Sequence, residues 1–324
     1  MVVLALAALL AAAPLQPSQD IPAAQDPPAA QASADPGAVD LGDVEVTGRP
    51  LDSLIRDFVG EVAEPNRRRS LARWDQEICV GVANLRNEPA QYIADRISTV
   101  ASDLNLQAGA PGCTPNLLVV ATEDGTEMAR LLVEERRRAF RMGGSGMDRG
   151  GDALEDFRDT DRPVRWWQMS LPVDSETGLR ATRIPGECQD PCQSPSDYAP
   201  QIAVFAASRL KTQIVDNIIR TIVIVDVDQV SHLSIQQLAD FIAMVSLAQI
   251  DPDADTRAYA SILNLFHDPD GNLGLTAWDR AYLGGLYDAE RTDANRRANL
   301  TEVARSIRRA HDQIRAGEDG AVTE

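Results

Sequence analysis

The chain has 324 residues, with 31 Lys and Arg against 49 Asp and Glu, which gives a net charge of −18 at pH 7. This negative charge repels phosphate backbones and anionic lipid surfaces, so nucleic acid and acidic membranes are excluded as the main partners. The length suits one large domain or two small ones.

The first 50 residues have the composition of a targeting segment followed by a linker. The apolar run Val2–Ala13 is too short to span a bilayer but suits the hydrophobic part of a signal peptide, which we place at residues 1–20. Residues 21–50 are rich in Ala, Pro, Gln and Asp without any period, which predicts a disordered linker. Residues 44–48 loosely resemble the short box of TonB-dependent transporters, although a short edge strand is the preferred interpretation. The expected mature chain has no transmembrane segment and is periplasmic or secreted.

Four cysteines follow this segment, and an even number in an oxidising compartment predicts disulfides. Three pairings exist, of which we favour Cys79–Cys113 and Cys188–Cys192. A zinc site is disfavoured because Cys-x-x-x-Cys spacing occurs only once and the two pairs lie in distant contexts.

The remaining pattern predicts an α/β (α+β) fold in one domain over residues 51–317, with a short tail at 318–324. Helical spacing and β-branched runs alternate, and one strand–helix–strand unit should bring its two strands parallel. In chain order we expect helix 51–62, strand 77–83, a helix opened by Pro89, strand 117–121, helix 126–140, a Gly-rich loop at 143–151, strand 164–172, a Pro-rich loop at 186–200, strand 202–207, an ambiguous segment at 210–219, and a last helix stopped at Gly317.

The centre of the fold is predicted at residues 221–250. Ile222–Val225 and Val227 are typical of a strand covered on both faces. Ser234 and Gln237 form a capping-box pattern before a helix that is apolar all round, which indicates a central buried helix. A second cap, Thr276 with Asp279, opens a C-terminal helix.

Three segments carry a resemblance to a known architecture. Ser261–Phe266, Leu275–Asp279 and Leu286-Tyr287 follow the central helix, and Ser246-Leu247 partly matches a Gly-Leu step. Together they resemble an uncharacterised family of secreted bacterial proteins with a zincin-like, metallopeptidase-type architecture, over residues 73–290. The resemblance implies a mixed twisted sheet, a central buried helix and C-terminal helices.

The metal-binding motif of that family is degenerate in this chain. Ala239 and Ala243 stand where the family has metal-binding side chains, and Asp240 stands at the general-base Glu. Alanine has no lone pair for zinc, and catalytic zinc needs three protein ligands and a water. We therefore expect no zinc, no other cofactor and a pseudo-enzyme on a peptidase-like scaffold.

Two functions from different classes follow. The first is a non-catalytic protein that binds a peptide or envelope protein, with Trp166, Trp167 and Asp240 as candidate binding residues. The adjacent tryptophans should point to opposite faces of a strand. The alternative is a metal-independent hydrolase that uses the carboxylates of Asp226, Asp228 and Asp240, with Asp240 as the candidate catalytic residue.

Overall fold

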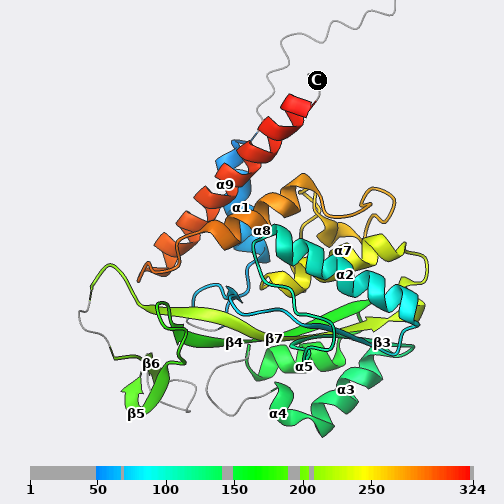
Figure 1. Cartoon of the computed structure of the whole chain (residues 1–324), viewed down its shortest axis with the longest axis horizontal. Coiled ribbons are helices and arrows are strands. Elements are labelled where there is room, and N and C mark those ends of the chain that lie inside the picture. The colour runs from blue at the N-terminus through cyan, green and yellow to red at the C-terminus, as the bar shows by residue number, and fades with distance from the viewer. Residues whose placement is uncertain (1–48, 67–68, 141–148, 189–197, 204–207, 322–324) are drawn as a thin grey trace, which may run out of the picture. The chain divides into compact units, whose positions relative to one another are not determined.

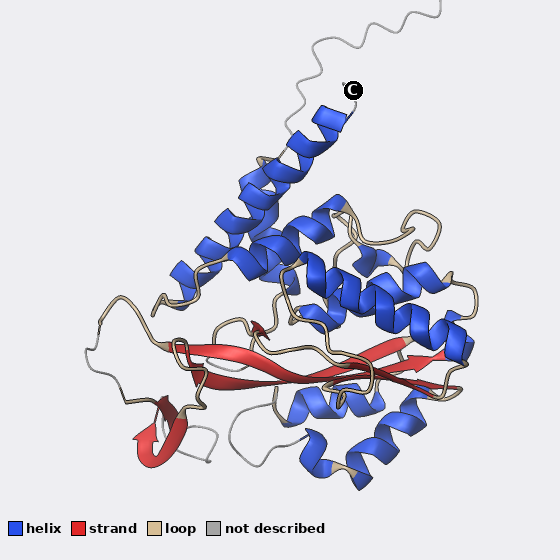
Figure 2. Cartoon of the chain, viewed as in Figure 1, coloured by secondary structure: helices blue, strands red, loops and turns tan. Residues whose placement is uncertain are grey.

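A mixed sheet separates two layers of helices in the part of the chain that the structure describes (Figures 1 and 2). The computed structural model describes residues 49–66, 69–140, 149–188, 198–203 and 208–321. The predicted signal peptide, nearly all of the predicted linker and the candidate strand at residues 44–48 lie outside these ranges.

The sheet is built on β7, a strand of 13 residues that pairs on both of its edges. On one edge β7 is parallel to β1 and β3, and β3 is parallel to β2; on the other edge β4 is antiparallel. A separate antiparallel pair joins β5 and β6. The strands are β1 Arg73–Trp74, β2 Val80–Ala83, β3 Leu117–Thr122, β4 Val164–Asp174, β5 Thr182–Cys188, β6 Tyr198–Gln201 and β7 Ile214–Asp226.

Helices cover both faces of this sheet (Figure 1). One face carries α1 Leu51–Val62, α2 Asn87–Asp103, α7 Ile235–Leu247, α8 Ala277–Asp288 and α9 Arg296–Ala321. The opposite face carries α3 Gly125–Glu135, α4 Arg137–Phe140 and α5 Gly151–Asp159. The short α6 Val227–Val230 follows β7, and the 3-10 turn η2 Ile262–Asn264 precedes α8.

This arrangement confirms the α/β class and explains the apolar run in β7. Val223 and Val225 belong to the large core under α7, whereas Ile222 and Ile224 belong to a smaller core under α3 and α5. Successive side chains of a strand point to opposite faces, so a strand with helices on both sides needs an uninterrupted apolar sequence.

The central helix α7 begins and ends with its backbone groups satisfied. The predicted capping box is confirmed, because Ser234 Oγ accepts from the Gln237 N–H and the Gln237 side chain accepts from the Ser234 N–H. At the other end, the indole of Trp74 donates to the Ser246 carbonyl at 2.9 Å and the Tyr287 hydroxyl donates to the Leu247 carbonyl at 2.7 Å. Neighbouring elements thus hold the last turn of α7 in place.

Several predicted boundaries are wrong, and each error has a local cause. Pro89 is the third residue of α2 rather than the first, since the helix starts at Asn87. A break at Arg136 divides the predicted helix 126–140 into α3 and α4. Gly317 lies inside α9, which continues to Ala321.

Three further segments differ from the sequence prediction. The helix α5, at residues 151–159, was not predicted, because only Leu154 and Phe157 are buried on it. The expected Pro-rich loop contains the end of β5 and the start of β6. Residues 202–203 are not in a strand, and the rest of the strand expected at 202–207 lies outside the described residues.

The disulfide prediction is confirmed for one pair. Cys79 and Cys113 are bonded, with Cα atoms 6.0 Å apart and a separation of 34 positions in the sequence. The bond ties the start of β2 to the loop before β3, so it reinforces the parallel strand pair. Of the second predicted pair, Cys188 ends β5, and Cys192 lies outside the described residues. No helix among the described residues is long and apolar enough to cross a membrane.

Candidate functional site

A groove with an aromatic floor lies between β4 and α7, at the end of β4 where Val164 pairs with the end of β7. Its volume is about 270 Å³. Trp166 and Phe241 supply two of the rings of this aromatic floor, and Phe266 supplies a third from the segment after η2. Trp166 is predicted from the sequence as a binding residue, whereas the two phenylalanines are not, because they come from segments distant in the chain.

The three rings fix one another in edge-to-face geometry. The ring centroids of Trp166 and Phe241 are 6.0 Å apart, and those of Phe241 and Phe266 are 4.8 Å apart. The Trp166 indole also donates to the carbonyl of Ile250 at 3.1 Å, so its polar atom is satisfied inside the protein. The groove therefore presents a rigid apolar surface rather than a polar one.

Charged side chains surround this apolar floor at the groove's rim. Arg162 lines the groove and makes ion pairs with Asp253 at 2.6 Å and with Asp156 at 3.2 Å. Asp251 and the exposed His267 also line it. A ligand would thus meet an apolar centre and a rim with both signs of charge.

Trp167 lies on the other side of the sheet, as the alternation of side chains predicts. It is completely buried with Phe140 and Phe157, and its indole donates to the Phe140 carbonyl at 3.2 Å. The sheet itself therefore separates Trp167 from the groove, and Trp166 is the one of the two tryptophans that lines it.

Asp240 is buried within α7, where both carboxylate oxygens have partners. One oxygen pairs with the guanidinium of Arg96 from α2, and the other accepts from the Leu275 N–H at 2.9 Å. Only 1% of the Asp240 side chain is exposed. The residue thus joins α7 to α2 and to the segment before α8, rather than presenting a lone pair to a substrate.

The other two candidate carboxylates do not join Asp240 in one site. Asp226 accepts from the Gly125 N–H at 3.0 Å and from the Gln229 N–H at 3.2 Å, so it caps α6 and fixes the start of α3. Asp228 is exposed. Among the described residues, no three His, Cys, Asp or Glu side chains gather in a way that can hold a metal ion.

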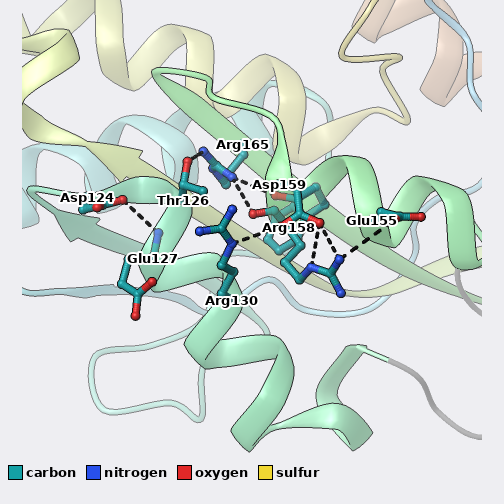
Figure 3. A network of polar contacts seen from close by, with 9 residues as sticks. Asp124, Thr126, Glu127, Arg130, Glu155, Arg158, Asp159 and Arg165 are labelled. Atoms are coloured by element: carbon teal, nitrogen blue, oxygen red, sulfur yellow. Dashed lines mark hydrogen bonds and ion pairs between the residues drawn. The ribbon is translucent and has the colours of Figure 1, made fainter.

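A polar network lies beside the start of α3 and joins it to α5 (Figure 3). Arg165 donates to Thr126 Oγ1 at 2.9 Å and to the Phe157 carbonyl at 2.9 Å. Arg130 and Arg158 both donate to Asp159, at 3.1 Å and 2.8 Å. In Figure 3 these side chains point toward one another, which indicates a network that secures α5 to the sheet.

The segments that carry the zincin-like resemblance are linked in space. Ser261 Oγ donates to Asp279 at 2.6 Å, and the Ile262 N–H donates to the same carboxylate at 2.8 Å. The confirmed capping box at Thr276 places Asp279 for these bonds. This contact anchors η2, and with it Phe266, at the groove.

The fold and this site define a mixed α/β protein with an aromatic groove beside its central helix. No protein-family model, no curated protein and no solved structure matches the chain.

Proposed function

We propose that this chain is a non-catalytic binding protein that holds a large apolar side chain of a peptide or protein partner in the Trp166 groove. The observation that carries the proposal is the aromatic floor formed by Trp166, Phe241 and Phe266. Because these rings are already held in place, binding an apolar anchor costs them no further side-chain entropy, which favours affinity.

The size of the groove favours a side chain over a free small molecule. Its volume of about 270 Å³ is smaller than the roughly 300–1,000 Å³ of most small-molecule sites. Interfaces between proteins commonly depend on one or two aromatic or apolar anchors that enter such pockets. The charged rim at Arg162 and Asp251 offers hydrogen-bonding groups to the partner's backbone and to the polar residues next to its anchor.

The carboxylate hydrolase remains the competing class, and the positions of the carboxylates count against it. A general base needs a free oxygen within hydrogen-bond reach of its substrate. Both oxygens of Asp240 are occupied, and Asp226 is engaged with backbone N–H groups. We therefore propose a binding function rather than a hydrolytic one. The scaffold of this proposed binding protein resembles a peptidase, and the protein acts in the periplasm or outside the cell.

A peptide-selection experiment tests the proposal. Random peptides are selected on the full chain, and the retained peptides are identified by mass spectrometry. Enrichment of intact peptides with a shared aromatic or large aliphatic residue is expected. Retained peptides that are cleaved during incubation would favour the hydrolase instead.

A matched pair of variants locates the binding surface. Leu263 lines the groove, so Leu263→Glu places a charge against the aromatic floor and should reduce retention at least about tenfold. Leu273 is 72% exposed outside the groove, so Leu273→Glu makes the same chemical change as a control. Equal retention by both variants, with melting temperatures showing that both are folded, would reject the groove as the site.

The compartment is tested separately, since binding does not depend on it. Expression of the full chain in a bacterial host should give mature protein in the periplasmic fraction, shortened at its N-terminus. Recovery of an unprocessed chain only from the cytoplasm would reject the periplasmic or secreted location.

A further inference from the structure

A second cavity lies at the opposite end of the sheet from the Trp166 groove. It has a volume of about 440 Å³ and is lined by residues of β1, β4 and β7 and by the segment that follows α8. Two arginines line it, Arg73 from β1 and Arg291 from that segment. Both are half-buried, so two like charges lie partly shielded from water at one cavity.

Hydrogen bonds hold one side of the Arg73 guanidinium in place. Its Nη1 donates to the carbonyls of Leu286 at 2.7 Å and Ala289 at 3.0 Å, at the end of α8. Its Cζ lies 5.9 Å from the centre of the Tyr287 ring. The Nε and Nη2 atoms donate to no described residue, so these donors remain for a ligand.

Arg291 is fixed in a similar way. Its Nη2 donates to the Asp216 carbonyl and to Asn217 Oδ1, the latter at 2.5 Å, whereas its Nε and Nη1 donate to no described residue. Neither Arg73 nor Arg291 makes an ion pair with a described carboxylate. Burial, and after it the charge of Arg291, lowers the pKa of Arg73 to about 10.

The entrance of the same cavity is acidic. Five carboxylates line it, those of Asp75, Asp174, Asp288, Glu290 and Glu302, and three of them, Asp75, Asp288 and Glu290, are exposed. Arg309 pairs with Asp288 and Glu302, which leaves the carboxylates in excess. These carboxylates repel polyanions such as nucleotides and attract cations. The cavity thus combines guanidinium donors, which suit a carboxylate, with an acidic entrance, which suits an ammonium group.

We propose that this cavity binds the carboxylate end of a basic amino acid, either free or as the last residue of a peptide. The ligand's carboxylate accepts hydrogen bonds from Arg73 and Arg291, and its ammonium group lies beside the acidic entrance. The volume of about 440 Å³ is within the range of small-ligand sites. The inference does not depend on the Trp166 groove.

Calorimetry on the full chain tests this with four probes: L-lysine, the tripeptide Gly-Gly-Lys, 1,5-diaminopentane and inorganic phosphate. We expect lysine or the tripeptide to bind at least about tenfold more tightly than the diamine, which lacks the carboxylate, and more tightly than phosphate. Tighter binding of lysine indicates a site for the free amino acid, and tighter binding of the tripeptide indicates a peptide C-terminus. Equal binding of the diamine or of phosphate, or no binding of either lysine probe, would overturn the proposal.

Variants separate this site from the rest of the molecule. Arg291→Gln should weaken binding of the lysine probes at least about tenfold. Arg257 is an exposed arginine paired with Asp255, so Arg257→Gln is the matched control and should bind as the unchanged chain does. Leu263→Glu, in the Trp166 groove, should also leave lysine binding unchanged, so that failure of one site is distinguished from failure of the other.

A second variant keeps the test decisive if Arg291→Gln does not fold. Asp174 Oδ1 accepts from the N–H groups of Glu176 at 2.8 Å and Thr177 at 3.0 Å. Asn at position 174 retains this acceptor and removes the charge, so Asp174→Asn should fold and bind the lysine probes several-fold more weakly. Unchanged affinity in this variant would contradict the role of the acidic entrance.

Discussion

Asp240 offers the sharpest test of whether the central helix is structural or catalytic. Asn at this position keeps one acceptor for the Leu275 N–H but loses the charge-assisted bond to Arg96. Such a bond contributes roughly 1.5–3 kcal/mol. The Arg96 side chain is 25% exposed, so its charge can reach water, and we expect Asp240→Asn to lower the free energy of unfolding by about 2 kcal/mol.

Replacing Arg96, the other member of the ion pair, should lower the free energy of unfolding by more than Asp240→Asn does. Arg96→Met leaves the Asp240 carboxylate buried with only the Leu275 N–H as partner, and an uncompensated buried charge costs about 3–5 kcal/mol. We expect about 3 kcal/mol, because the exposed side of Arg96 lets water approach. The double variant should lose less than the sum of the single variants, since both remove the same ion pair.

Urea denaturation followed by far-ultraviolet circular dichroism measures all four members of this cycle. The free energy of unfolding must fall with urea concentration at the same slope in all four proteins, so that differences between the unfolding midpoints report stability alone. Additive losses in the double variant would refute the coupling between Asp240 and Arg96. A fully stable Asp240→Asn that abolished a measurable hydrolysis would refute the structural role altogether.

Other predictions concern the disulfide, the metal, the helix cap and the buried tryptophan. Replacing Cys79 and Cys113 with Ser should lower the free energy of unfolding by about 4 kcal/mol, the loop-entropy value for a separation of 34 residues, as measured by urea titration without reductant. Chelator should leave the melting temperature unchanged, and elemental analysis should find no stoichiometric zinc; one zinc per chain would contradict this. Thr276→Ala removes a confirmed cap and should cost about 1 kcal/mol. Trp167→Ala should cost about 3–5 kcal/mol, because a fully buried side chain leaves a cavity, yet leave peptide retention of the folded protein unchanged.

Local sequence signals predicted the parts of the fold that depend on neighbouring residues. The cap at Ser234 and the helix at Leu51–Val62 need only residues within a few positions, and both are confirmed. The parallel pairing of β2 and β3 followed from a chirality rule for strand–helix–strand units. In contrast, α5 has too few apolar residues for its helical period to be evident.

The candidate sites were harder to predict, because they combine residues from distant segments. Trp166 could be selected as one of two adjacent tryptophans, but its companions Phe241 and Phe266 join it only through the packing of α7 and η2 on the sheet. The pairing of Asp240 with Arg96 spans 144 positions and leaves no local pattern. Such contacts are set by tertiary packing, which the sequence of either segment does not encode alone.

The length of β4 and β7 sets how the two sites can be used together. Val164 lines the groove and Val173 lines the cavity, and these positions are nine residues apart along β4. At about 3.3 Å per residue the two sites are about 30 Å apart. A single extended peptide would need roughly ten residues to occupy both, and a flexible tether of suitable length would convert two weak contacts into one tight attachment. Shorter ligands would fill the two proposed sites independently, so their binding free energies should simply add.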